Sequence, residues 1–322
     1  MILPAVELVE SRSQRLQPVI DPPSLHHRLI DSWLMGSNYK PNTQKAYRIH
    51  VLAFLAWNGD RPLASISNDR AVRYKLYLLK ERQTPKGKGL SVNTVNTILL
   101  AVKSFFTWYA AFRMPPGSLS PFKAAKFEKR PPLTRRDLSL ENLAKLITAA
   151  AQDEVFGPRD VLIVELLRHG LRASEALALN CGAIQNGVIF VAESKTGQSR
   201  QVPMLPELEA ALDDYLEFCQ SEIQYQWEPR SPLVLTLSSS RHRRLTYAGL
   251  YKRFAKLMAI AGVEGSPHWL RHTFASDMLR KGIAPEHAML LMGHGRDAFR
   301  RYTIGVQQDA AIAAFHVAYK SE

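Results

Sequence analysis

Apolar residues recur at helical spacing through the first third of the chain. This spacing predicts four amphipathic helices, at about 24–35, 42–57, 69–82 and 91–112. None of the segments between them alternates apolar and polar residues as a half-buried strand would. Residues 24–113 are therefore predicted to form a compact helical domain, and residues 1–23, with four prolines and little periodicity, a flexible leader.

The pattern becomes mixed in residues 138–322. Helical spacing continues at about 140–151, 158–169, 171–179, 206–220, 246–261, 285–292 and 308–320. Two runs, 187–193 and 199–203, are instead rich in β-forming residues, and the turn residues between them predict a hairpin. The predicted fold class is mostly α with a small antiparallel β-sheet, in which an N-terminal four-helix domain precedes a C-terminal mixed α/β domain.

Residues 114–137 are predicted to link the two domains. They contain five prolines and lack a sustained apolar period. Basic residues outnumber acidic ones, and we expect Lys123 and Lys126 to pass along a phosphate backbone. A merely solvated hinge is the alternative.

Charge narrows the class of partner. The 322 residues carry a formal net charge of +13, and the pI is about 9.8. This balance favours nucleic acid as the partner, with an acidic membrane surface second. No apolar run approaches the roughly 18 residues of a membrane span, so a soluble, cytoplasmic protein without a membrane partner is expected. Only Cys181 and Cys219 occur, far apart and without metal-ligand spacing, so neither a disulfide framework nor a zinc site is predicted.

Basic residues gather in two further places. The third predicted helix carries Arg70 and Arg73 on a face beside its apolar anchor. In the second domain, residues 241–256 hold six lysines and arginines and no acid. A face that only contacts water would rarely carry charges of a single sign. We therefore predict that this strip faces DNA through Arg243, Arg244, Lys252 and Arg253.

A helix that begins at Ser266 has the features of an anion site. Ser266 is a suitable N-cap and Pro267 suits the first helical position. His268 and Arg271 are three residues apart, so we expect them on one face beside the free N–H groups of the first turn. Taken alone, a surface helix with a chance histidine and arginine fits equally well.

Six polar residues at the ends of predicted elements suggest what the anion is. Two arginines, a lysine and two histidines can surround a phosphodiester, and a tyrosine can attack it. No cluster of carboxylates suited to two magnesium ions and no nucleotide motif occurs, which favours phosphoryl transfer without metal or cofactor. The six residues are Arg172, Lys195, His268, Arg271, His294 and Tyr302.

In these residues the chain resembles the tyrosine recombinases of the phage integrase family, including its Xer-like members. The motif G-L-R-x-S-E matches Gly170-Leu171-Arg172-Ala173-Ser174-Glu175, and the hairpin lysine of the family matches Lys195 in Ser194-Lys195-Thr196-Gly197. The motif H-x-L-R-H-T-F-A-[ST] matches residues 268–276, L-[LM]-G-H matches 291–294, and Tyr302 stands in the place of the nucleophile. The N-terminal part is similar to the SAM-like, core-binding domain of the family.

The resemblance implies a site-specific DNA recombinase that clamps duplex DNA between its two domains. Tyr302 would attack the scissile phosphate and form a 3′-phosphotyrosine, while Arg172 and Arg271 hold that phosphate. Lys195 would protonate the leaving oxygen. His268 would accept a proton or donate to the phosphate, His294 would donate a second hydrogen bond, and Glu175 would support the site. Four protomers would join two DNA sites by exchanging the C-terminal helix at 308–320.

Some positions leave alternatives open. The step from His294 to Tyr302 is eight residues where many relatives have nine. Arg200 competes with Lys195 in the hairpin, where the turn position favours the lysine. His272 is interpreted as a buried histidine of the core.

Two other functions remain open from the sequence. A tyrosine-type DNA topoisomerase could use a similar set of residues, and a DNA-binding regulator could keep the fold without activity. The integrase-like N-terminal domain argues against the first, and the complete set of polar residues argues against the second.

Overall fold

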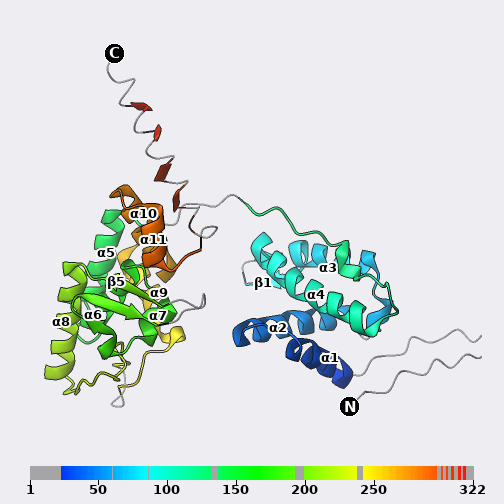
Figure 1. Ribbon diagram of the computed structural model, residues 1–322, viewed down its shortest axis with the longest axis horizontal. Coiled ribbons are helices and arrows are strands. Elements are labelled where there is room, and N and C mark those ends of the chain that lie inside the picture. The colour runs from blue at the N-terminus through cyan, green and yellow to red at the C-terminus, as the bar shows by residue number, and fades with distance from the viewer. Residues whose placement is uncertain are drawn as a thin grey trace, which may run out of the picture. The chain divides into compact units, whose positions relative to one another are not determined.

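The computed structural model describes residues 23–59, 61–85, 87–131, 137–192, 199–237 and 242–295. Beyond these it describes 299, 302, 303, 306, 307, 311, 312, 315 and 316. The chain divides into two compact units, Met1–Pro132 and Leu133–Glu322. Each unit has its own hydrophobic core, and Figure 1 labels the helices and strands that form it.

The first unit is the predicted four-helix domain. Its helices are α1 (Pro23–Met35), α2 (Pro41–Asn58), α3 (Asn68–Lys80) and α4 (Val92–Arg113), with a 3₁₀ turn η1 at Leu63–Ser65. The hydroxyls of Ser67 and Ser91 accept from the backbone N–H groups of Arg70 and Thr94, which caps α3 and α4. Edge-to-face aromatic contacts centred on Phe54 fill the core.

A short hairpin in this unit was not predicted. Strands β1 (Gln83–Thr84) and β2 (Gly87–Lys88) pair antiparallel between α3 and α4. Two residues a strand are too few to show an alternating pattern, which explains the missed prediction. The chain leaves β2 through Gly89 at φ +84°, where a Cβ would lie 2.1 Å from the Leu79 carbonyl oxygen, so only glycine fits there.

Helix α4 has the length and composition to cross a membrane, the one helix of the described residues that does. Its apolar face is nevertheless occupied within the protein, since Val95, Leu99, Phe105 and Phe106 are fully buried in the core of the unit. The helix is therefore explained as the central core helix of this domain.

Part of the predicted linker packs on the first unit. The 3₁₀ turn η2 (Pro121–Lys123) buries Phe122 completely, and Ala125 is buried with it. Asn96 on α4 exchanges two hydrogen bonds of 2.9 Å with the backbone of Glu128, whose carboxylate also pairs with Lys75 at 2.7 Å. The chain is thus held against α3 and α4 as far as Glu128, while residues 132–136 lie outside the described residues.

The second unit surrounds one buried helix. Helix α6 (Gly157–Arg168) carries fully buried Leu162, Val164, Leu166 and Leu167, and it packs against neighbours on several sides. The other helices are α5 (Leu140–Ala151), α7 (Ala173–Ala178), α8 (Pro206–Ser221), α9 (Tyr247–Ala261), α10 (Pro267–Arg280) and α11 (Pro285–Met292). The C-terminal end of α6 leads directly to the first motif arginine.

A three-stranded antiparallel sheet completes this unit. The predicted hairpin is formed by β4 (Val188–Val191) and β5 (Arg200–Pro203), in register from Val188 opposite Pro203 to Val191 opposite Arg200. Strand β3 (Ile184–Gln185), which follows the 3₁₀ turn η3 (Cys181–Ala183), adds to the other edge of β4 and was not predicted. The fold class is mostly α with small antiparallel sheets, as predicted.

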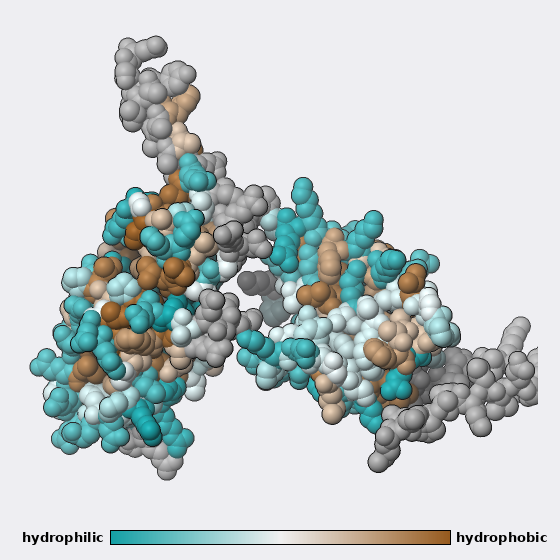
Figure 2. Space-filling view, in the orientation of Figure 1, coloured by the Kyte–Doolittle hydropathy of each residue, from teal (hydrophilic) through white to brown (hydrophobic). Residues whose placement is uncertain are grey.

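Polar and apolar residues are mixed over the visible surface of each unit (Figure 2). Several large apolar side chains of the second unit are exposed, among them Leu290 on α11 at 69% and Leu140 on α5 at 80%. Single exposed residues of this kind are normal for a folded protein.

Candidate active site

The first motif arginine follows a backbone turn that only glycine permits. Gly170 ends α6 with φ +83°, and a Cβ there would lie 2.6 Å from a ring carbon of Phe274 and 2.9 Å from the sulfur of Met292. The chain turns sharply at this point, which places Arg172 at the N-cap of α7. The Arg172 backbone N–H donates to the Glu175 carboxylate at 2.8 Å, the side-chain half of a capping box.

Glu175 is the centre of a charged cluster. Its carboxylate accepts hydrogen bonds from Arg172 at 2.5 Å and from both terminal nitrogens of Arg200 at 3.1 and 2.6 Å. A terminal nitrogen of Arg271 lies 3.6 Å away. Burial alone would raise the pKa of this carboxyl, but the hydrogen bonds from Arg200 and Arg172 outweigh burial and lower it to about 2. Glu175 therefore stays ionised and orients the arginines.

Arg271 is the largest fully buried side chain among the described residues. Its two terminal nitrogens donate to the carbonyls of Gly170 and Met292, and its Nε has no hydrogen-bond partner among the described residues. Burial first, and then the positive charge of Arg172, lower its pKa to about 9. Three guanidinium groups thus share one carboxylate, and an anion would relieve that imbalance.

Arg200, the alternative to Lys195 in the predicted hairpin, joins this cluster. Its side chain is 6% exposed, and its Nε donates to the Leu291 carbonyl at 2.8 Å. Alternation along β5 puts Arg200 on the same face as fully buried Val202. That alternation was the available signal, because a basic residue on the buried face of a strand requires an acidic partner.

The three arginines also cap the end of α11. The carbonyls of Leu291, Met292 and Gly293 accept in turn from Arg200, Arg271 and Arg172. The last carbonyls of a helix lack partners within the helix and form the negative end of its dipole, so cations are favoured there. The start of α7, the start of β5 and the end of α11 are thereby tied together.

The histidines and the tyrosine lie next to this capped end. His294 follows Gly293, and its ring stacks on Tyr302 at 5.9 Å and 6°. The ring of His272 lies 5.1 Å from Tyr302 and 4.4 Å from His268. Tyr302 is 5% exposed and packs on Phe299. The four rings therefore form one row in the order His268, His272, Tyr302 and His294.

The start of α10 differs from the expected cap. The Ser266 side chain makes no capping bond, and its backbone carbonyl instead accepts from the Trp269 N–H at 2.8 Å. His268 is exposed whereas Arg271 is buried, so the two do not present one open face. The long Arg271 side chain reaches inward because two carbonyl acceptors lie there.

Two cavities adjoin the arginine cluster. One, of about 600 Å³, is lined by Arg172, Glu175 and Asn180. The other, of about 820 Å³, is lined by Arg200, Gly293 and His294.

Lys195 lies outside the described residues, which omit 193–198, and most of the predicted helix at 308–320 does so too. No group of three or more histidines, cysteines or acids suited to a metal occurs within the described ranges.

The basic residues of the predicted DNA strip in the second unit differ in how exposed they are. Arg243 and Lys252 are exposed. Arg244 instead donates to the Leu179 carbonyl at 2.8 Å and to the Asn180 side chain at 2.5 Å. The guanidinium groups of Arg244 and Arg253 are thus engaged inside the protein, and their role at DNA remains a prediction.

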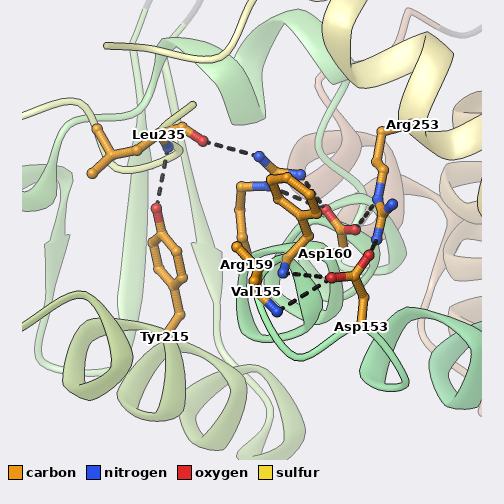
Figure 3. A network of polar contacts seen from close by, with 8 residues as sticks. Asp153, Val155, Arg159, Asp160, Tyr215, Leu235 and Arg253 are labelled. Carbon is orange, nitrogen blue, oxygen red and sulfur yellow. Dashed lines mark hydrogen bonds and ion pairs between the residues drawn. The ribbon is translucent and has the colours of Figure 1, made fainter. Parts of the chain in front are cut away.

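Figure 3 shows the partners of Arg253. It pairs with Asp160 and, at 2.7 Å, with Asp153, while Arg159 holds the other side of Asp160 at 2.8 Å. Burial works against the charge of Arg253, but the hydrogen bonds to Asp160 and Asp153 prevail and raise its pKa. This network fixes the α5–α6 connection to α9.

The basic residues predicted for DNA in the first unit are mostly open to solvent. Arg73, Lys123 and Lys126 are exposed. Arg70 lies over the Trp57 ring at 4.1 Å, and its Nε donates to the Asn58 side chain at 3.2 Å. Arg70 is consequently held in a fixed orientation at the start of α3.

Two family models match the chain, the phage integrase family over residues 136–303 and the phage integrase N-terminal SAM-like domain over residues 28–114. The tyrosine recombinase XerD of Ralstonia nicotianae is 28% identical over 270 residues, which are 83% of this chain and 84% of that protein. The tyrosine recombinase XerA of Thermococcus kodakarensis is 27% identical over 268 residues, 82% of this chain and 85% of that protein.

Solved structures share the fold. The Tn1549 transposon integrase in complex with a circular intermediate DNA has a TM-score of 0.69 at 20% identity, covering 85% of this chain and 93% of that one. A lambda integrase tetramer bound to a Holliday junction has a TM-score of 0.66 at 19% identity, covering 86% and 76%. The family model spans the whole segment from α5 to Tyr302, more than half of the chain. The chain belongs to the phage integrase family and is similar over most of its length to the tyrosine recombinases XerD and XerA.

Proposed function

We propose that the protein is a site-specific DNA recombinase that cleaves and rejoins duplex DNA through a 3′-phosphotyrosine intermediate. The observation that carries the proposal is the unbalanced cluster around Glu175, in which three guanidinium groups share one carboxylate next to Tyr302. A phosphodiester supplies the missing negative charge, and family membership makes DNA its source.

The arginines act as the phosphate clamp. Arg172 is 26% exposed and lines the smaller cavity, where it can turn a terminal N–H toward a non-bridging oxygen. Arg271 adds a buried charge at fixed position, so little reorganisation is needed as the pentacovalent transition state gains charge. Arg200 and Glu175 keep both groups in place.

Tyr302 is the nucleophile of the proposal. Its oxygen attacks phosphorus, the bond from phosphorus to the 5′-oxygen breaks, and the phenolic proton passes to a base of the ring row, for which His268 is our assignment. His294 donates a hydrogen bond to the phosphate, and Lys195 returns a proton to the leaving 5′-oxygen. The energy of the broken ester is kept in the phosphotyrosine, so resealing needs no nucleotide and no cofactor.

Assembly is the second part of the proposal. A lambda integrase with this fold is seen as a tetramer on a Holliday junction. In our chain Ile312 and Phe315 are 51% and 58% exposed, three residues apart within the segment predicted to exchange between protomers. We propose a homotetramer on two DNA sites, linked by that segment.

The test is covalent capture of genomic DNA fragments from the region flanking the gene. Protein–DNA adducts that resist denaturation are isolated, and the attached strand end is mapped. We expect one recurrent cleavage site, a 3′ linkage to Tyr302, and no adduct with Tyr302→Phe that still binds the same DNA. An adduct retained by Tyr302→Phe would contradict the assignment of the nucleophile.

Two controls separate the other functions. Relaxation of a supercoiled plasmid that lacks the mapped site would indicate a topoisomerase. Specific binding without any adduct, at several pH values and with nicked DNA that traps the intermediate, would indicate a regulator.

A further inference from the structure

A histidine outside the row of rings holds the turn on which the clamp is built. His169 caps the C-terminal end of α6 and is fully buried. Its Nδ1 lies 2.8 Å from the Glu165 backbone carbonyl, and its Nε2 accepts the Leu205 N–H at 3.2 Å. One ring thus joins the last turn of α6 to the segment between β5 and α8.

These two contacts define the tautomer. A backbone N–H can only donate, so Nε2 must carry a lone pair, and the carbonyl at Nδ1 requires the proton there. The imidazole is therefore neutral and protonated at Nδ1. A second proton on Nε2 would set one N–H against another and break the bond to Leu205.

The position of this ring matters because the next residue is Gly170. The Gly170 carbonyl accepts from Arg271, and Gly170 has no room for a side chain. The His169 ring also stacks on Phe274 at 6.1 Å, one turn beyond Arg271 on α10. The ring therefore constrains the Arg271 acceptor through the backbone of α6 and its neighbour on α10.

The same ring constrains the other half of the cluster. Strand β5 starts at Arg200, which holds Glu175, and the chain beyond its end reaches Leu205, which His169 holds. The first residue of β5 is consequently held by the charged cluster, and the segment after β5 is held by the turn that precedes Arg172.

We propose that His169 is a positioning residue for the phosphate clamp: its neutral imidazole fixes Gly170 and β5, and its protonation loosens both and slows DNA cleavage. The proposal rests on the proposed function for its kinetic part. Its structural part, the tautomer and the tie to Leu205, stands apart from any activity.

Among the described residues, few charged groups face the ring. On α6, Glu165 Oε2 lies 3.7 Å from Nδ1, but this carboxylate is engaged by Arg168 at 3.0 Å. On α8, Glu207 lies 3.9 Å from Arg168, and α10 contributes the apolar Phe274. Burial, the largest effect, lowers the pKa of His169 below its usual 6.5, against the raising influence of the Glu165 carbonyl.

The sign of the pH dependence follows from this direction. Below pH 6.5 the unfolded chain binds a proton that the folded chain resists, so His169 makes folding less favourable as pH falls through that range. Stability is expected to fall as pH drops below 6.5, and the clamp of folded molecules to loosen as pH falls through the lower pKa of the folded ring, whereas above 6.5 neither changes with pH through His169.

The experiment compares the full-length wild-type protein with His169→Phe and His169→Gln. Phenylalanine keeps the ring but removes both hydrogen bonds, whereas the glutamine amide oxygen can still accept from Leu205. Single-turnover adduct formation on the mapped DNA site is measured from pH 5.5 to 8. We expect His169→Phe to slow cleavage about 10- to 100-fold at pH 7.5 with DNA affinity changed less than about threefold, and His169→Gln to recover most of the rate.

The matched control is His287→Gln, on an exposed histidine of α11. Its rate at each pH is expected to equal that of the wild type. His169→Gln, which cannot titrate, should keep more of its rate at pH 5.5 than the wild type keeps. A rate for folded His169→Phe within about twofold of wild type, or identical acid limbs for wild type and His169→Gln, would overturn the proposal.

Nitrogen-15 spectra of histidine-labelled protein decide the case if His169→Phe fails to fold. The signal lost in His169→Gln should show an unprotonated Nε2 and a protonated Nδ1 at pH 7. A cationic ring or the opposite tautomer at that pH would refute the proposal. If the wild type forms no adduct while this signature is present, the proposed function fails and the positioning role is judged by the loss of stability on the acid side in wild type but not in His169→Gln.

Discussion

Two buried arginine clusters of the second unit are built from the same groups in different proportions. Around Asp160, two guanidinium groups meet two carboxylates, and each charge has an opposite partner (Figure 3). Around Glu175, three guanidinium groups meet one carboxylate. Arg253 has its pKa raised by its partners, whereas Arg271 has its pKa lowered to about 9 by burial and by Arg172.

The difference distinguishes scaffold from site. A balanced cluster has nothing to gain from an incoming ion, and its value lies in holding α5, α6 and α9 together. An unbalanced cluster is destabilised by its own repulsion until an anion enters, so part of the free energy of binding is released where the transition state gains charge. Substitutions in the two clusters should therefore affect different measurements.

The largest effect is expected from the unbalanced cluster. Arg172→Ala or Arg271→Ala should slow adduct formation by about 10³-fold or more, roughly 4 kcal/mol, because a preorganised positive charge is lost at the phosphate. The measurement is single-turnover cleavage of DNA at saturating protein. Arg253→Ala is the matched control, and molecules of that variant that remain folded should cleave at nearly the wild-type rate. The contrast between the clusters would be wrong if Arg253→Ala cleaved as slowly as Arg172→Ala.

A smaller effect, on stability, is expected from the balanced cluster. Asp160→Asn leaves Arg159 and Arg253 without their shared carboxylate, and the free energy of unfolding should fall by about 3 kcal/mol. Urea unfolding measures this change, with Asp213→Asn on the exposed face of α8 as the control. A loss below about 1 kcal/mol would mean that the network contributes little.

The contribution of Glu175 to stability is expected to depend on pH. The pKa of Glu175 is held at about 2 against its ordinary 4.5, so its contribution is complete above pH 4.5 and disappears as pH falls toward 2. The difference in unfolding free energy between wild type and Glu175→Gln should shrink by at most about 3 kcal/mol across that window. Parallel curves for the two proteins between pH 5 and 2 would show that Glu175 is not the group that titrates.

The smallest effect is expected at the surface. Lys252→Ala should weaken DNA binding by less than about tenfold and reduce the slope of log affinity against log salt by about one, since one phosphate contact is lost. Arg253, its neighbour on α9, is already paired with Asp153 and Asp160. Titrations at several salt concentrations test the difference, which vanishes if Arg253→Ala changes the slope as much as Lys252→Ala does.

Much of the fold could be predicted because helices of ten or more residues repeat their apolar positions several times. Apart from the helix predicted at 308–320, most of which lies outside the described residues, the predicted helices of both units, including α6 and α11, are found close to their predicted bounds. The short strands β1, β2 and β3 were missed, since two residues carry no period. The packing of Phe122 was missed for a similar reason, because prolines surround the few apolar residues there.

The sequence identified which residues form the site, but not which atoms they contact. The motif residues Arg172 and Arg271 do meet at Glu175, yet the sequence suggested an open face at the start of α10 where Arg271 is buried. Arg244 and Arg253 were assigned to a DNA strip by charge alone. The aspartates that pair with Arg253 lie 93 and 100 positions earlier, a distance over which charge patterns give no information.

The hydrogen bonds at the end of α11 bear on which residues of this segment can change among homologues. Its three arginine acceptors are main-chain carbonyls, at Leu291, Met292 and Gly293, so no side chain there encodes them. The same three oxygens would be present with other side chains at 291 and 292. The motif residues there are therefore constrained by packing, which places the fully buried Met292 against Gly170, and by the left-handed turn at 293, where φ is +58°. The hydrogen bonds themselves constrain only the arginine donors and the course of the backbone.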